Sequence, residues 1–137
     1  MKQITTAIIL FTFSACSLGT KKLEDKVQTV RFHYIAWACD CANWATGSDI
    51  DRYADNGDQL AEHSVFIEPA NPALTLPDTL GYNGDIILFT GQYYVEKGFP
   101  RNFRSEEPVD KAKVFRYTAY KIIKSNHRAA AIAITQE

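Results

Sequence analysis

The sequence lacks a strong charge of either sign, since its 137 residues carry 15 Lys and Arg against 16 Asp and Glu. A nucleic-acid-binding domain would show a clear basic bias, so we expect no nucleic-acid partner. Methionine occurs only at Met1, which excludes a methionine-rich copper site. The chain also lacks the GxSxG, HExxH and phosphate-binding glycine-loop motifs of common enzymes. We therefore expect a protein without catalytic activity.

Long hydrophobic runs are missing too, because no stretch approaches the roughly 20 apolar residues that a membrane-spanning helix needs. The N-terminal run from Ile4 to Phe13 is about half that length and follows the positive charge of Lys2. Two small residues, Ser14 and Ala15, then precede a cysteine. This order is typical of a secretory signal peptide.

The residues FSAC, Phe13 to Cys16, resemble the lipobox of bacterial lipoproteins, with Phe13 in the place of the usual leucine. In that class the signal is cut before the cysteine, which then carries several acyl chains and anchors the protein stably. The resemblance implies a signal peptide over 1–15, lipidation of Cys16 and a membrane partner through the lipid anchor. Ser17 is not the aspartate that retains some lipoproteins at the inner membrane, which favours the outer membrane, on a face that stays open. An ordinary secreted protein is the alternative.

The mature chain reads as one domain behind a linker. Ser17 to Lys26 is polar and charged without periodicity, so we expect a lipidated cysteine and flexible tether over 16–26. A single β-rich domain is expected over 27–137, which is long enough to enclose a core.

Strands are expected where β-branched and aromatic residues concentrate. These segments are 27–41, 63–68, 86–96 and 112–123, and the tail after residue 126 offers a last strand or a short helix. Val30, Phe32 and Tyr34 would share one face of the first strand. Tyr82 to Asp85 predicts a turn, and Gly91 a bulge or a close backbone approach.

One short helix is expected over 48–54, with Ser48 and Asp51 at capping-box spacing and Asn56-Gly57 as its stop signal. The fold is therefore mainly β, a small antiparallel barrel or sandwich of four or five strands with one short helix. Strand number also allows an oligonucleotide/oligosaccharide-binding (OB) barrel. The helix of that fold lies between its third and fourth strands, whereas the expected helix follows the first.

Three states are possible for the thiols of Cys39 and Cys41. On one face of a regular strand their Cα atoms would lie about 6.6 Å apart, at the far edge of disulfide geometry. Oxidation is nevertheless the usual outcome outside the cytoplasm, and two packed thiols are the second reading. The third is a metal site completed by His33 and His63, which would suit zinc or copper. One residue between the cysteines is fewer than structural zinc sites use, so no cofactor is predicted.

The segment from residue 97 to 104 alternates basic and aromatic side chains, which can bind anions or sugars through charge and stacking. The candidate ligand contacts are Lys97, Phe99, Arg101, Phe103 and Arg104, with Trp37 and Trp44 at the mouth of the barrel. The alternative is that the phenylalanines fix a long loop to the core while the charges face water. The acidic residues between 49 and 62 do not fit a calcium loop and read as solvated surface.

Together these features predict a membrane-anchored envelope lipoprotein with a small non-catalytic binding or structural domain. Its partner would be an envelope protein or a glycan. The alternative is a thiol-based metal-binding or redox protein that uses Cys39-Asp40-Cys41.

Overall fold

The computed structural model describes residues 21–125. The expected signal peptide, the lipidation site at Cys16 and the expected final strand or helix after residue 126 lie outside the described residues.

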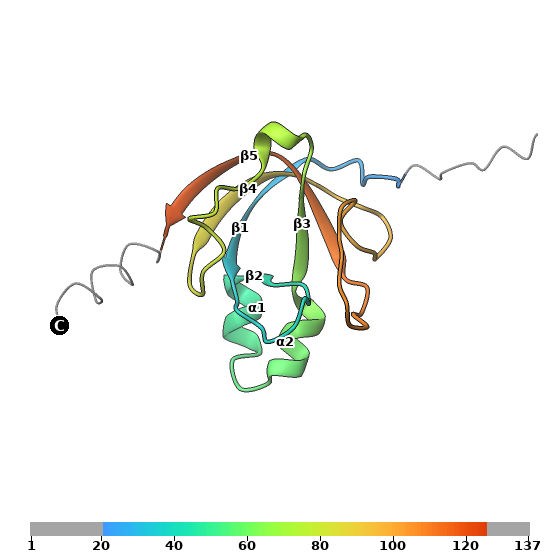
Figure 1. Ribbon diagram of the computed structural model, residues 1–137. Helices are drawn as coiled ribbons and strands as arrows, with labels where there is room; N and C mark the ends of the chain where they lie inside the picture. The colour runs from blue at the N-terminus through green and yellow to red at the C-terminus, as the bar shows by residue number, and fades with distance from the viewer. Residues whose placement is uncertain (1–20, 126–137) are drawn as a thin grey trace, which may run out of the picture.

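Five strands close into a small barrel in the order β1-β2-β3-β5-β4 (Figure 1). The strands are β1 (Gln28–Tyr34), β2 (Trp44–Thr46), β3 (Val65–Pro69), β4 (Ile86–Tyr93) and β5 (Lys113–Lys124). The helices are α1 (Gly47–Arg52), α2 (Gly57–His63) and the 3-10 turn η1 (Pro72–Leu74). The prediction of a mainly β, small barrel with a short helix is confirmed.

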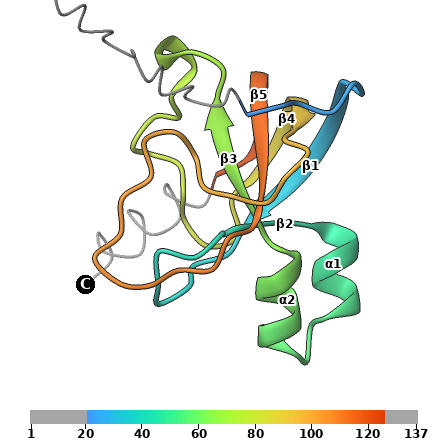
Figure 2. The same cartoon turned by 90° about the vertical axis from the view of Figure 1, so that its right-hand side faces the viewer.

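Neighbouring strands are antiparallel except β3 and β5, which run parallel with Phe66 opposite Val114. This strand order, with its parallel pair, is that of an OB barrel. The helices depart from that fold because both lie between β2 and β3. Figure 2 shows α1 and α2 side by side at one end of the barrel.

Aromatic side chains fill the barrel. Phe32, Phe89 and Phe115 are fully buried, and the ring of Phe32 meets that of Phe115 edge to face at 5.5 Å. The expected alternation in β1 is confirmed, because Val30, Phe32 and Tyr34 all pack in this core. Trp44 is 3% exposed and packs edge to face on Phe89 at 5.5 Å. Trp44 is therefore a core residue, and the ligand contact expected of it stays a prediction.

The first strand is much shorter than the expected 27–41. It ends at Tyr34, and the backbone N–H of Ile35 donates to the carbonyl of Asn43 at 2.8 Å. Residues 35–43 are thus a hairpin loop, which we call the 35–43 loop, and β2 returns along β1 with Tyr34 opposite Trp44. Strand β2, at three residues, is too short for its sequence to show an alternating pattern.

Helix α1 begins at Gly47 and is capped by Thr46, two residues before the predicted cap at Ser48. The Thr46 hydroxyl accepts from the backbone N–H of Asp49 at 3.2 Å and donates to the Asp49 carboxylate at 2.6 Å. Asn56, expected to stop this helix, instead starts α2 by accepting from the backbone N–H of Gln59 at 3.1 Å. Asparagine is common both in turns and at helix N-caps, and in this chain Asn56 is an N-cap.

Two glycine-dependent features are confirmed. The turn at 82–85 forms with Asp85 N–H donating to Tyr82 C=O at 2.9 Å and with Gly84 at φ 85°. At Gly91, where the β4–β5 register shifts, a Cβ atom would lie 2.7 Å from the Cα of Tyr117. Strand β5 therefore approaches β4 closely only because this position has no side chain.

The described part of the expected tether is bonded to the barrel. Val95 N–H donates to Lys22 C=O and Glu24 N–H donates to Tyr93 C=O, each at 2.9 Å. Leu23 bridges Tyr94 and packs on the smaller of two core clusters. Ordered structure therefore begins before Val27, and only residues that precede Lys21 remain as an expected tether.

Candidate functional site

A pocket of about 1040 Å³ lies between the 35–43 loop, α2 and the long loop that joins β4 to β5, residues 94–112. We call it the α2 pocket. Phe32, Val65 and Tyr93 of the barrel line it, together with Cys41 and Ala42. Thus segments from across the chain meet at one site, which strand closure brings together.

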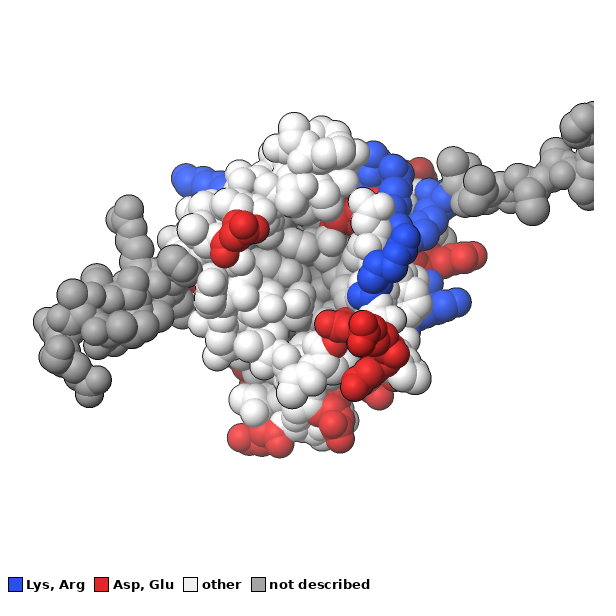
Figure 3. Space-filling view, in the orientation of Figure 1, with Lys and Arg blue, Asp and Glu red and all other residues white. Residues whose placement is uncertain are grey.

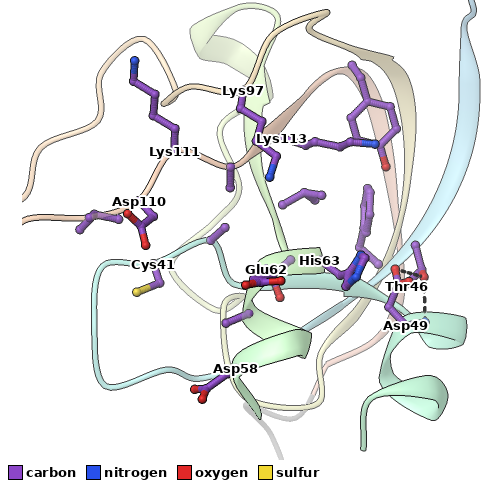
Figure 4. Close-up of a pocket in the computed structure, with 18 of the residues that line it drawn as sticks. Cys41, Thr46, Asp49, Asp58, Glu62, His63, Lys97, Asp110, Lys111 and Lys113 are labelled. Carbon is purple, nitrogen blue, oxygen red and sulfur yellow. Dashed lines mark hydrogen bonds between the residues drawn. The ribbon is translucent and has the colours of Figure 1, made fainter. Parts of the chain in front are cut away.

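Charged side chains of both signs line the α2 pocket (Figure 4). Lys97 points into it from the 94–112 loop, and Glu62 lies across from it on α2. Lys113 extends over the Tyr93 ring, with its Nζ atom 5.6 Å from the ring centroid, whereas Lys111 points away. Asp49, held by its bonds to Thr46, forms the far side. The cations of the pocket come from the 94–112 loop and β5, and its carboxylates come from the helices and from Asp110 of the loop.

Tyr93 supplies a neutral hydroxyl to this wall. Burial, followed by the charge of Asp49, raises the pKa of Tyr93 to about 12. Its ring packs edge to face on Phe115 at 4.9 Å. At neutral pH the phenol is protonated, so it can exchange hydrogen bonds with a ligand without adding charge.

The two histidines that were considered as metal ligands do not form a ligand set with the cysteines among the described residues, although His63 lines the α2 pocket as Cys41 does. His63 stacks on Tyr53 with ring centroids 4.5 Å apart and planes within 7°. His33 lies beside Gly47, and burial, with the nearby charge of Arg31, lowers the pKa of its imidazole. Neither arrangement is that of a ligand to the cysteine sulfurs.

Cys39 and Cys41 are joined by a disulfide, with their Cα atoms 5.2 Å apart. The 35–43 loop turns at this point, so the extended-strand spacing of about 6.6 Å did not apply. Within residues 21–125, no group of three His, Cys, Asp or Glu side chains is placed to hold a metal ion. Among the three open states, the structure therefore shows the disulfide. The redox reading stays a prediction, which equilibration in glutathione buffers followed by thiol alkylation would measure.

Trp37 closes the same loop, because its indole Nε1 donates to the carbonyl of Ala42 at 2.9 Å. The indole is half-buried against its own loop. Its expected ligand contact is untested, and the structure shows a part in shaping the 35–43 wall of the pocket.

The aromatic residues of the 94–112 loop fix it to the barrel, as the alternative reading held. Phe99 and Phe103 stack at 4.7 Å, and both rings meet Phe66 of β3. Arg104 donates to the carbonyl of Phe103 at 2.9 Å and is otherwise exposed. Of the five predicted contacts in this loop, only Lys97 lines the α2 pocket.

A buried carboxylate beneath the loop completes its attachment. Glu68 of β3 is 3% exposed and accepts from the Tyr94 hydroxyl at 2.6 Å and from the Arg101 backbone N–H at 2.8 Å. The Arg101 and Arg116 side chains approach the same carboxylate at 3.3 Å and 3.9 Å. Burial, with the Glu68 bond, raises the pKa of Tyr94. Arg101 is therefore a structural partner of Glu68, and its expected ligand contact stays a prediction.

Sequence reasoning missed the helix side of the pocket. Asp58 and Glu62, predicted to be solvated surface, are exposed, but the sequence did not show that α2 brings them to one pocket with Lys113 and Tyr93. The N-cap at Asn56 was the one signal that could have revealed α2, and with it the carboxylates it presents.

No known family model matches this chain, and neither a curated protein nor a solved structure matches it. Within residues 21–125 no helix is long and apolar enough to cross a membrane.

Proposed function

We propose that this protein is a lipid-anchored envelope protein whose barrel binds a ligand in the α2 pocket. The observation that carries the proposal is the place of the pocket on the barrel. OB barrels bind their ligands on the face of strands 2 and 3 and between the loops that join strands 1–2 and 4–5. In this chain those loops are 35–43 and 94–112, and both line the α2 pocket. The proposal is supported by analogy with the ligand sites of OB barrels and by the presence of a pocket at the corresponding place.

The charges of the pocket favour a ligand that carries both signs. Lys97 and Lys113 suit a carboxylate, and Glu62 suits an amine, while the Tyr93 hydroxyl suits a sugar or peptide oxygen. A glycan with a short peptide attached has all of these groups. In the envelope this is the chemistry of peptidoglycan fragments, which we propose as the ligand class and which fits the expected glycan partner.

The test is the binding of a disaccharide with its stem peptide, measured by calorimetry. Glu62→Gln and Lys113→Gln should each weaken binding about tenfold, because each removes one charge-assisted hydrogen bond. Lys121→Gln, on the exposed end of β5, is the matched control and should bind as the unchanged protein does. Equal affinity in all four proteins, or no binding at all, would contradict a peptidoglycan ligand in this pocket.

The anchor is tested separately at Cys16. We expect the membrane-extracted protein to begin at Cys16 and to carry the added mass of its acyl chains, as measured by mass spectrometry of the intact chain. Cys16→Ser should abolish both the cleavage and the added mass, because the thiol is the acylated group. A mature protein that begins at another residue without lipid would support the ordinary secreted alternative.

A further inference from the structure

A second hollow, of about 530 Å³, lies where the described chain begins. We call it the N-terminal groove. Lysines and the loop beside Tyr94 line it: Lys21, Lys22, Lys97, Lys111, Val95, Phe99 and Pro100. Figure 3 shows lysine and arginine atoms gathered on this side of the molecule.

The groove is held in shape by bonds between its two walls. The Lys21 ammonium donates to the carbonyl of Phe99 and lies 5.6 Å from the centroid of the Tyr94 ring. The hydrogen bond from Val95 N–H to Lys22 C=O holds Lys22, the residue after Lys21, against the same loop. An ammonium group has three donors, so Lys21 retains capacity for an external acceptor.

The charge of the groove differs from that of the whole protein. Its four lysines are all exposed, and two of them, Lys97 and Lys111, also line the α2 pocket. Among residues 21–125, Glu96 is the only acidic residue that lines the groove, while the chain as a whole has a net charge of −1. Val95 stands beside these lysines with 54% of its surface exposed. A basic cluster with an exposed apolar side chain suits the interface of an anionic membrane, where charge and shallow insertion act together.

We infer that the N-terminal groove docks on the phosphate headgroups of anionic lipids. For its position the inference rests on the proposed anchor, since Lys21 follows Cys16 so closely that the linking chain can span at most about 17 Å. The lysines would then lie on the membrane and orient the α2 pocket relative to it. The charge and geometry of the groove do not depend on the anchor.

The experiment uses the chain from residue 17 onward, which retains every contact described above but carries no lipid. Its binding to vesicles of phosphatidylglycerol and of phosphatidylcholine is measured by sedimentation at low and physiological salt. We expect binding only to the anionic vesicles, weakened by salt because the attraction is screened. Lys21→Gln with Lys22→Gln should lower the affinity about 25-fold, at about fivefold for each lysine near an anionic surface.

The matched control is Lys121→Gln with Lys124→Gln, which removes two exposed lysines at the far end of β5 and should change the affinity less than twofold. Equal binding to both vesicle types, or an equal loss in both double variants, would overturn the inference. Full competition by inorganic phosphate would overturn it in favour of a site for free anions. A missing acyl chain on Cys16 would refute the anchor alone, because these vesicle measurements do not involve it.

Discussion

Replacing Glu68 with alanine is expected to lower the free energy of unfolding by about 3–5 kcal/mol, the usual loss when one partner of a buried ion pair is removed. The carboxylate is buried and serves two arginine side chains, the Tyr94 hydroxyl and one backbone N–H. Without it the Tyr94 hydroxyl and the Arg101 backbone N–H lose their acceptor beneath the loop, whereas the Arg101 side chain, which is 61% exposed, can turn to water. Urea denaturation followed by tryptophan fluorescence measures the change.

The effect should be largest in the 94–112 loop, because Glu68 holds the Arg101 backbone there. Hydrogen exchange of that loop should rise before the barrel unfolds. Glu68→Gln keeps the size and the acceptor oxygen, so its loss should be smaller. Glu96→Ala removes an exposed carboxylate and is the control, with a change within about 0.5 kcal/mol. A loss below about 1 kcal/mol for Glu68→Ala would show that the ion pairs add little.

Gly91→Ala is expected to destabilise the barrel by about 3 kcal/mol, at the upper end of the usual penalty for overpacking. The added methyl would overlap the carbonyl oxygen of Arg116 and lie 2.7 Å from the Cα of Tyr117. Both are backbone atoms of β5, which no side-chain rotation can move aside. Strands β4 and β5 would have to separate at the point where their register shifts.

The matched control for this substitution is Gly98→Ala. A Cβ at Gly98 would meet nothing within 4 Å, so its stability should change by less than about 0.5 kcal/mol. Thermal unfolding by circular dichroism compares the two variants. If Gly91→Ala has the same melting temperature as Gly98→Ala and the unchanged protein, the close approach of β4 and β5 does not require glycine.

The sequence predicted correctly those features that depend on neighbouring residues alone. Alternation located the core face of β1, the turn residues located 82–85, and an isolated glycine in an apolar run located the bulge at Gly91. The β4 and β5 strands followed from β-branched and aromatic residues that continue long enough to show their character. These elements gave the fold class, a small barrel with little helix.

The remaining features could not be predicted because they depend on contacts between residues far apart in the sequence. The state of Cys39 and Cys41 depended on the turn of the 35–43 loop, which tertiary packing decides. Glu68 resembles any acid before a proline until β5 and the 94–112 loop surround it. The α2 pocket combines residues from 32 to 113, so no single stretch of sequence predicts it.

Closure of the barrel through β1 and β4 has a consequence for how the chain acquires its structure. Gln28 pairs with Gly91, and Phe32 with Ile87, so the first strand completes its edge only when the fourth is present. The β3–β5 pair is likewise distant in sequence and parallel. Such non-local pairing makes folding slow, in the range of milliseconds to seconds. A chain that emerges N-terminus first would therefore expose the edge of β1 until residue 91 has followed, and during that time it would depend on protection from aggregation.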